Sequence, residues 1–256
     1  MKISAVIIAG NEEQKIADAI RSVDWADEVL VIDSESTDRT REIAESLGAR
    51  VINKPWPGFS AQKQFGVESA AFDWILSIDA DERISPELRA EIQNIQRAGS
   101  EKTDGYRIPR LTYYMERAIR HCGWYPDRQL RLFDRRKGKW KDVLIHESVE
   151  MQTDARIENL SAEITHFTSD GALHHHEMIG KRYAPLAARQ MFENGKRTSP
   201  LHIATAGAIA FFSTYILKIG FLDGLPGFCI ARFAAHHAFL KHLCLWELQN
   251  GSRKAE

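Results

Sequence analysis

The stretch Trp74–Glu82 reads WILSIDADE and is the most informative part of the chain. Its first five residues are mostly apolar, as in a buried strand, and the run ends in two carboxylates, Asp79 and Asp81, spaced i, i+2. In an extended backbone this spacing places both side chains on the same face. There they can hold Mg²⁺ or Mn²⁺ against the phosphates of a substrate. An acidic turn after a strand is the purely structural alternative.

Four strand-and-helix units are expected in the first hundred residues. Short β-branched runs predict strands at Ile3–Ala9, Glu28–Ile32, Arg50–Ile52 and Trp74–Ile78. Helical spacing of apolar residues predicts helices at Ile16–Val23, around Ile43–Leu47, at Phe59–Ala70 and from Pro86 onward, with Asn11 as the cap of the first. Strands alternating with helices indicate a parallel sheet with right-handed crossovers. The fold class is therefore α/β and Rossmann-like.

The strand ends carry acidic residues and lack the glycine-rich phosphate loops of other nucleotide-binding proteins. There is no GxGxxG after the first strand and no GxxxxGK[ST] in the chain, which argues against a dinucleotide oxidoreductase and a P-loop NTPase. Glu12, Asp33, Asp79 and Asp81 follow strands instead. Carboxylates suit ribose hydroxyls, base N–H groups and a metal, so they indicate a nucleoside diphosphate bound through a divalent cation.

Three motifs in order along the chain carry a family resemblance. They are IIAGNEE at Ile7–Glu13, VIDSESTDRT at Val31–Thr40 and IDADE at Ile78–Glu82, and together they resemble the signature of family 2 glycosyltransferases. Glu35 stands where that family commonly has glycine. The resemblance implies a nucleotide-sugar transferase of the GT-A type.

The downstream chain narrows the resemblance. Gly123–Phe133, His146-Glu147 and Gly220–Phe228 are similar to the subgroup of lipopolysaccharide-core β-glucosyltransferases, over essentially the whole length. This similarity implies a nucleotide diphosphate hexose donor, with UDP-glucose as the expected one, and inversion at the anomeric carbon.

The resemblance also implies roles for individual residues. Those expected to bind the nucleotide sugar are Ala9, Asn11, Glu12, Asp33, Lys63, Asp79 and Arg131. Asp81 is the expected metal ligand, and His146 is expected to complete the metal shell or touch a phosphate. Arg128 is expected, like Arg131, to face a phosphate-bearing group.

Inversion by direct displacement needs a general base for the acceptor hydroxyl, and one carboxylate is enough. Asp127 is favoured, because in related enzymes the base follows the Asp-x-Asp strand by a few dozen residues, and Glu147 is the alternative.

The C-terminal part has a different composition. Residues 181–256 carry 10 Lys and Arg against 4 Asp and Glu, and Thr198–Leu217 has no formal charge. A basic, apolar tail is expected to lie in a membrane interface, with a true span and a soluble helical subdomain as alternatives. The expected domains are a catalytic domain at 1–170 and a helical, membrane-associating region at 171–250. Three cysteines without CxxC spacing favour a reducing, cytosolic setting.

The sequence therefore predicts a metal-dependent inverting glycosyltransferase, peripheral on the cytoplasmic face of the cell membrane. Its expected partners are a nucleotide-sugar donor, a lipid-linked saccharide acceptor such as lipopolysaccharide core, and the membrane surface. The acidic front of the chain argues against nucleic acid. A nucleotidyltransferase that makes nucleotide sugar and a non-catalytic nucleotide- or saccharide-binding membrane adaptor are the alternatives.

Overall fold

The computed structural model describes residues 1–99, 103–143, 147–167 and 171–251. The chain forms two compact units. The first contains Met1–Leu111 and Pro126–Phe167. The second contains Thr112–Tyr125 and the described part of Thr168–Glu256. The segment Thr112–Tyr125, which lies within the expected catalytic domain by sequence position, thus packs with the C-terminal helices.

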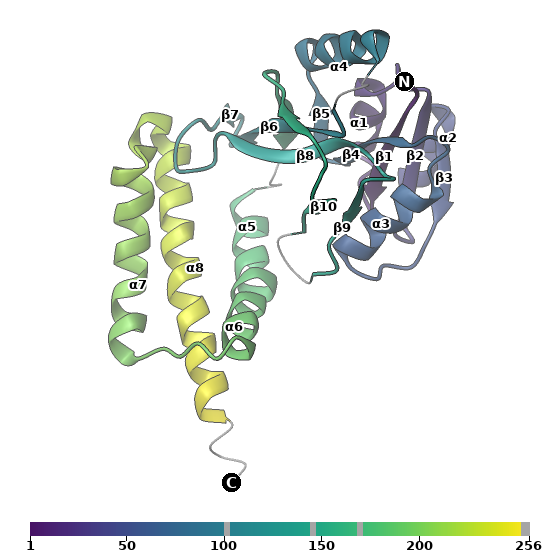
Figure 1. The fold of residues 1–256 in the computed structure, drawn as a ribbon. Coiled ribbons are helices and arrows are strands. Elements are labelled where there is room, and N and C mark those ends of the chain that lie inside the picture. The colour runs from purple at the N-terminus through teal and green to yellow at the C-terminus, as the bar shows by residue number, and fades with distance from the viewer. Residues whose placement is uncertain (100–102, 144–146, 168–170, 252–256) are drawn as a thin grey trace. The chain divides into compact units, whose positions relative to one another are not determined.

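The core of the first unit is a mixed sheet (Figure 1). Four strands pair in parallel in the order β3-β2-β1-β4, and they are β1 (Ile3–Ala9), β2 (Glu28–Asp33), β3 (Arg50–Asn53) and β4 (Trp74–Asp79). The sheet continues from β4 in the order β8-β6-β12-β5, and these strands are β5 (Glu82–Ile84), β6 (Gly105–Tyr114), β8 (Asp127–Asp134) and β12 (Ile164–Phe167). β8 is antiparallel to both β4 and β6.

Smaller strands extend this sheet and form a second one. β7 (Arg117–Ala118) and β11 (Ile157–Asn159) pair with β6. β9 (Gly138–Trp140) and β10 (Val149–Met151) form a separate antiparallel pair. The parallel strands confirm the α/β prediction, and the antiparallel half is an addition that the sequence pattern did not predict.

Helices cover both faces of the parallel strands. These helices are α1 (Ile16–Ser22), α2 (Thr40–Ser46), α3 (Phe59–Ser69) and α4 (Pro86–Ala98). Alternate residues of β1 point to opposite faces, as strand geometry requires. Ile3, Ala5 and Ile7 pack in the cluster that contains α1 and α4, and Val6 and Ile8 pack in the cluster that contains α3. Both faces are therefore apolar, which is typical of a parallel sheet.

Helices α4 and α1 begin in different ways. Ser85 caps α4, since its hydroxyl accepts a hydrogen bond from the Leu88 N–H at 3.1 Å. The prediction that Asn11 caps the first helix is wrong. That helix begins only at Ile16, without a side-chain cap, and the Asn11 side chain bonds to Thr37 in the next loop.

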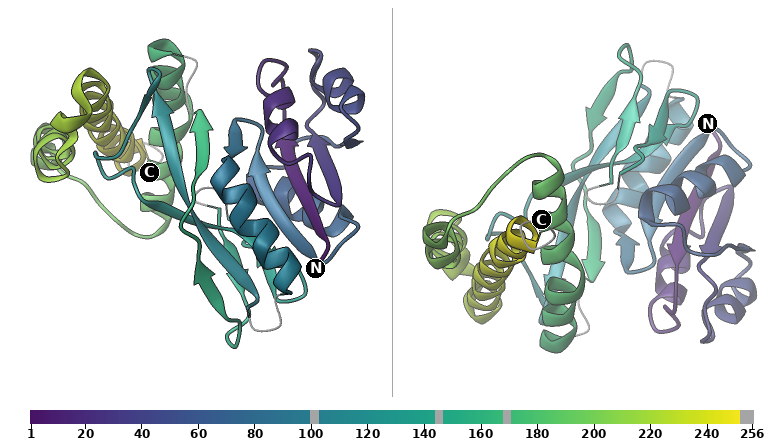
Figure 2. Two further views of the ribbon diagram at one scale, coloured as in Figure 1. Left: turned by 90° about the horizontal axis from the view of Figure 1, so that it is seen from above. Right: turned by 90° about the horizontal axis from the view of Figure 1, so that it is seen from below.

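The second unit is helical. Its elements are α5 (Ala172–Met178), a π-helical turn η1 (Ile179–Tyr183), α6 (Ala184–Glu193), α7 (Pro200–Phe212), a second π-helical turn η2 (Ser213–Leu217), a 3₁₀ turn η3 (Gly220–Asp223) and α8 (Gly224–Gly251). α7 and α8 run antiparallel side by side (Figures 1 and 2). Among the described residues, Pro200–Leu217 is the one helical segment long and apolar enough to cross a membrane, judged by length and composition alone.

The start of α8 is fixed to the segment Thr112–Tyr125 by polar contacts. Asp223 accepts hydrogen bonds from the His121 N–H at 2.9 Å and lies 2.9 Å from His121 Nδ1. Cys122 donates its N–H to the carbonyl of Lys218 at 3.0 Å. A Cβ on Gly227 would lie 1.9 Å from the carbonyl oxygen of Gly220, so only glycine fits there. The motif Gly220–Phe228 therefore has a packing role in this unit.

Candidate functional site

The first two sequence motifs form loops that hydrogen-bond to each other beyond the carboxyl ends of β1 and β2. Asn11 has a φ of 58°, and its side-chain oxygen accepts a hydrogen bond from the Thr37 N–H at 2.8 Å. The Asn11 N–H donates to Ser36 Oγ, and the Glu12 N–H donates to Thr40 Oγ1, each at 2.8 Å. Asn11 and Glu12 thus fix the shape of the loops through their backbones and through the side chain of Asn11.

Asp33 lies at the end of β2, paired in register with Ala9 at the end of β1. Its side chain is fully buried. Ser36 donates its N–H to one carboxylate oxygen at 2.9 Å and its hydroxyl to the other at 2.5 Å. Arg41 Nε lies 3.7 Å away. Asp33 therefore organises the second loop, and its contact with a nucleotide stays a prediction.

Asp79 ends β4 next to Ile8 of β1, so it reaches the same edge of the sheet as Asp33. Lys63 Nζ from α3 lies 3.0 Å from Asp79 Oδ1, and Arg131 Nη2 from β8 lies 3.2 Å from Oδ2. Burial alone would raise the pKa of Asp79, but the charges of Lys63 and Arg131 outweigh it and hold that pKa well below its usual range. The carboxylate is thus kept ionised between two cations.

Arg131 occupies an irregular position in β8. Tyr106 of β6 pairs with Leu132, but the next residue, Arg107, pairs with Leu130. Arg131 is therefore the extra residue of a β-bulge, a feature that re-aims side chains and is common next to active sites.

Glu82 connects Arg131 to a second arginine. Its side chain is fully buried and accepts hydrogen bonds from the Asp79 N–H at 2.9 Å, from Arg131 Nη2 at 2.7 Å and from Arg110 Nη1 at 3.3 Å. Burial would lower the pKa of Arg131, but the charges of Glu82 and Asp79 raise it above its usual value. The alternating charges extend through Arg110 to Asp127.

The two candidate bases differ in how many hydrogen bonds their carboxylates accept. Asp127 accepts hydrogen bonds from Arg110 Nη2 at 2.6 Å, Arg110 Nε at 3.0 Å and Gln129 Nε2 at 2.6 Å. Among the described residues, Glu147 has a single polar contact, with Lys63 Nζ at 3.4 Å. Glu147 is also partly exposed, so its carboxylate has room to accept a proton.

Lys63 is buried, and its ammonium lies 4.9 Å from the centre of the Trp140 ring. The ammonium thus lies between the carboxylates of Asp79 and Glu147 and over the face of an aromatic ring, which attracts a cation. Lys63 thus bridges the acidic motif of β4 and the candidate base.

Asp81 lies in the turn between β4 and β5, so the expected extended backbone across Asp79 and Asp81 is not found. The physical reason is that Glu82 returns to accept the Asp79 N–H, which closes the turn. His166 Nε2 of β12 lies 3.3 Å from Asp81 Oδ2. A carboxylate and an imidazole are suitable ligands for Mn²⁺.

This donor pair fits a divalent cation that takes its other ligands from substrate phosphates and water. No cluster of three or more His, Cys, Asp or Glu that could hold a metal occurs among the described residues. One or two carboxylates together with substrate phosphates are nevertheless the usual ligands of Mg²⁺ at such sites, so a third protein ligand is not required. His146, the expected second ligand, lies outside the described residues.

The structure thus brings five of the expected residues into one contact network: Lys63, Asp79, Arg131, Asp127 and Glu147. Arg128 does not join it, because its Nη1 donates to the carbonyl of Leu160 at 2.9 Å. Glu82, Arg110, Trp140 and His166 have site contacts that sequence reasoning missed. Glu82 could have been predicted, since it directly follows the acidic motif. Arg110, Trp140 and His166 lie on strands that are distant from that motif in sequence, and only the folded sheets bring them to the site.

The chain is similar to one family model and to several known proteins. The family model described as "Glycosyl transferase family 2" matches residues 4–151, more than half of the chain. A protein of Rickettsia bellii described as an uncharacterized glycosyltransferase is 35% identical over 96% of this chain and 87% of its own length. The lipopolysaccharide core biosynthesis glycosyltransferase LpsC of Rhizobium meliloti is 31% identical over 94% of this chain and 90% of its own.

Among solved structures, this chain is similar to glucosyl-3-phosphoglycerate synthase from Mycobacterium tuberculosis, crystallised with Mn²⁺, UDP and glucosyl-3-phosphoglycerate. The identity is 28%, the TM-score is 0.36, and the match covers 44% of each chain.

Proposed function

The chain belongs to glycosyltransferase family 2, and from that premise we propose that it transfers a hexose from a nucleoside diphosphate sugar, UDP-glucose first among the candidates, to a saccharide hydroxyl with inversion. The observation that carries this proposal is the contact network around Asp79. It places two cations, Lys63 and Arg131, and a lightly engaged carboxylate, Glu147, at the carboxyl edge of the sheet. Ligands of open α/β sheets bind at this edge.

Asp81 and His166 would hold the divalent cation, which would neutralise charge on the leaving nucleoside diphosphate. Lys63 and Arg131 fix Asp79 in its ionised form and leave it as an acceptor for a hydroxyl of the donor. Because these groups are already held in place by Glu82 and Trp140, little reorganisation is needed when the donor binds.

The geometry favours Glu147 over Asp127 as the general base, the reverse of the order preferred from the sequence. A base has to accept the proton of the acceptor hydroxyl. Asp127 already accepts three hydrogen bonds, two of them from Arg110, whereas Glu147 has one long contact with the described part of the chain. We assign Asp127 the role of orienting Arg110.

The acceptor proposed here is a lipid-linked saccharide such as lipopolysaccharide core. The relative LpsC carries lipopolysaccharide core biosynthesis in its name, and the match spans nearly the whole of both chains. An acceptor anchored in lipid would place the enzyme at the cytoplasmic face of the membrane.

The helical unit has a surface suited to that location, at the turn between α7 and α8. Large apolar side chains are exposed there, namely Ile216, Leu217, Ile219, Phe221, Leu222 and Leu225. Exposed basic side chains accompany them in the same unit, namely Arg117, Arg120 and Lys218. Apolar residues with a basic rim match a bilayer surface with anionic headgroups. We name these nine residues the apolar tip.

The test of the proposed function is calorimetric titration of the detergent-solubilised protein with UDP, with and without Mn²⁺. Binding in the micromolar range that disappears in EDTA would support it and would justify assays of UDP-sugars against lipid-linked acceptors. Binding of another nucleotide in place of UDP would change the donor. A protein that binds no nucleotide under any of these conditions would contradict the proposal and favour a non-catalytic adaptor.

A further inference from the structure

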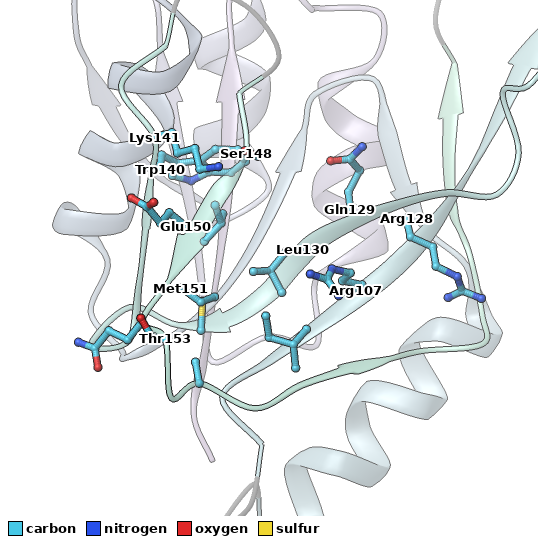
Figure 3. A pocket seen from close by; sticks show the side chains of 14 residues that line it. Arg107, Arg128, Gln129, Leu130, Trp140, Lys141, Ser148, Glu150, Met151 and Thr153 are labelled. Atoms are coloured by element: carbon cyan, nitrogen blue, oxygen red, sulfur yellow. The ribbon is translucent and has the colours of Figure 1, made fainter.

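A cavity of about 480 Å³ opens within the first unit, next to the contact network but outside it (Figure 3). Arg107, from β6, and Arg128, from β8, lie on one side of it. Trp140, Lys141 and Ser148 lie on the other side, at the β9–β10 pair. Its volume is within the range of about 300–1,000 Å³ that is typical of small-molecule sites.

The charged residues of the cavity are mostly basic. Three cations, Arg107, Arg128 and Lys141, line it together with one carboxylate, Glu150. Arg107 and Lys141 are exposed, and neither side chain forms a hydrogen bond or ion pair with another described residue. Their charges are therefore available to a ligand, and an arginine fork is suited to phosphate or carboxylate groups.

Trp140 forms a buried part of the cavity lining. The side chain is buried, with 6% of the residue exposed, yet its indole Nε1 has no hydrogen-bond partner in the described part of the chain. A buried N–H without a partner is costly, and an oxygen atom of a bound molecule would satisfy it only after the indole ring turns toward the cavity. The apolar residues Leu130, Met151 and Ile157 line the same cavity and suit the carbon face of a sugar ring.

One side chain separates the cavity from Asp127, and two separate it from Glu147. Gln129 lines it and donates a hydrogen bond to Asp127 at 2.6 Å. Trp140 lines it and covers the ammonium of Lys63, which contacts Glu147. The cavity would thus hold the anionic group of an acceptor, whose reacting hydroxyl has to extend past these side chains to a base.

From these observations we infer that the cavity is the acceptor subsite and that it selects a saccharide carrying a phosphate or carboxylate group, with Arg107 and Lys141 as the residues that determine this specificity. The inference rests on the proposed glycosyl transfer, and it adds the charge class of the acceptor. Phosphate and carboxylate share the chemistry that the two cations recognise, so the experiment has to separate them.

The experiment is a titration of the purified protein with glucose 6-phosphate, glucuronate and glucose, monitored by ligand-observed NMR, both without nucleotide and with UDP and Mn²⁺. We expect at least one anionic sugar to bind about tenfold more tightly than glucose, the size of effect that a hydrogen bond to a charged group provides. The double substitution Arg107→Gln, Lys141→Gln should remove that preference. Arg97→Gln, which changes an exposed arginine on α4 of the same unit, is the matched control and should keep it.

Preference for glucose 6-phosphate alone would identify phosphate as the recognised group, and equal preference for glucuronate would identify any anion of that size. If both anionic sugars bind no better than glucose, or if the double variant keeps the preference, the inference is overturned. UDP binding is read in the same samples, so loss of the acceptor inference with UDP binding intact is distinct from failure of the proposed function.

Discussion

The carboxylate of Asp81 and the imidazole of His166 lie 3.3 Å apart, and neither is needed to complete the apolar core. We therefore expect Asp81→Asn to reduce metal-dependent transfer by about 10²–10³-fold, because an amide is a weaker ligand and carries no charge. The midpoint of thermal unfolding should change by no more than about 2 °C, since the residue is partly exposed. Turnover with added Mn²⁺ and a thermal melt measure the two effects.

His166→Gln should act in the same direction, with a higher Mn²⁺ concentration needed for half-maximal UDP binding. Glu13→Gln, which changes an acidic residue of the first loop, is the control. If Asp81→Asn retains full activity at low Mn²⁺, these two residues do not hold the cation.

Glu147 and Asp127 can be separated by matched amide substitutions. Glu147→Gln should leave UDP binding intact and lower kcat by about 10²–10⁴-fold, the usual contribution of a general base. Asp127→Asn should lower kcat less, because its effect passes through Arg110, and it should also weaken stability by leaving that arginine with one fewer partner. Single-turnover transfer rates with saturating donor distinguish the two. A larger kcat loss in Asp127→Asn would restore Asp127 as the base.

At the scale of the element, Glu28 joins three parts of the parallel sheet. Its carboxylate accepts hydrogen bonds from Ser4 Oγ at 2.5 Å, the Ala71 N–H at 2.7 Å and Arg50 Nη2 at 2.7 Å. Burial would raise its pKa, but these hydrogen bonds and the charge of Arg50 together lower it below the usual value. The group thus binds its proton less tightly in the folded state.

This difference fixes the sign of a pH effect. The stabilisation by Glu28 is complete above its ordinary pKa and is lost as the pH falls through the lower pKa of the folded state. We expect Glu28→Gln to lower the free energy of unfolding by about 1–3 kcal/mol at neutral pH, because an amide cannot accept all of these hydrogen bonds. Urea unfolding at pH 7 and near pH 3 measures it. The difference from the wild type should shrink at the lower pH, and Glu45→Gln on the exposed side of α2 should show no such effect.

The parallel strands could be predicted because their signals are local. β1 begins and ends where its β-branched run predicts, and β2, β3 and β4 each extend one residue beyond the prediction. β5 and β12 are three and four residues long and contain charged or polar side chains, so no local pattern marks them. Their pairing depends on contacts distant in sequence, such as Ile84 with Ile164.

The site residues also divide into those that local sequence signals predict and those that depend on distant contacts. Asp79 and Lys63 could be expected to meet, because they lie on a strand and a helix of the parallel half. The positions of Arg110 and His166 depend on the antiparallel half, and the direction of Arg131 depends on a bulge, which single-sequence periodicity does not reveal.

At the scale of the whole molecule, the chain combines a catalytic unit with a helical unit whose apolar residues remain exposed. In α7 and η2, the segment Pro200–Leu217 has a mean hydropathy of 1.4 and only 6% of it is buried. Leaving so many apolar side chains in water is unfavourable, and contiguous apolar patches commonly mark an interaction surface. A bilayer is the occupant that the basic rim of the apolar tip favours.

We therefore expect the protein to sediment with vesicles that contain anionic lipids and to bind zwitterionic vesicles more weakly. The double substitution Phe221→Ser, Leu222→Ser should reduce the bound fraction by about tenfold or more, because each large apolar side chain contributes about 1.5–3 kcal/mol when buried. Lys218→Glu should reduce binding to anionic vesicles only, by removing the attraction to their headgroups. Leu201→Ser is the matched control, since Leu201 is exposed near the opposite end of α7. If Leu201→Ser weakens binding as much as the tip substitutions, the helix lies along the membrane and the tip has no special role. If none of the variants changes sedimentation, the apolar tip does not bind the bilayer and the membrane proposal is wrong.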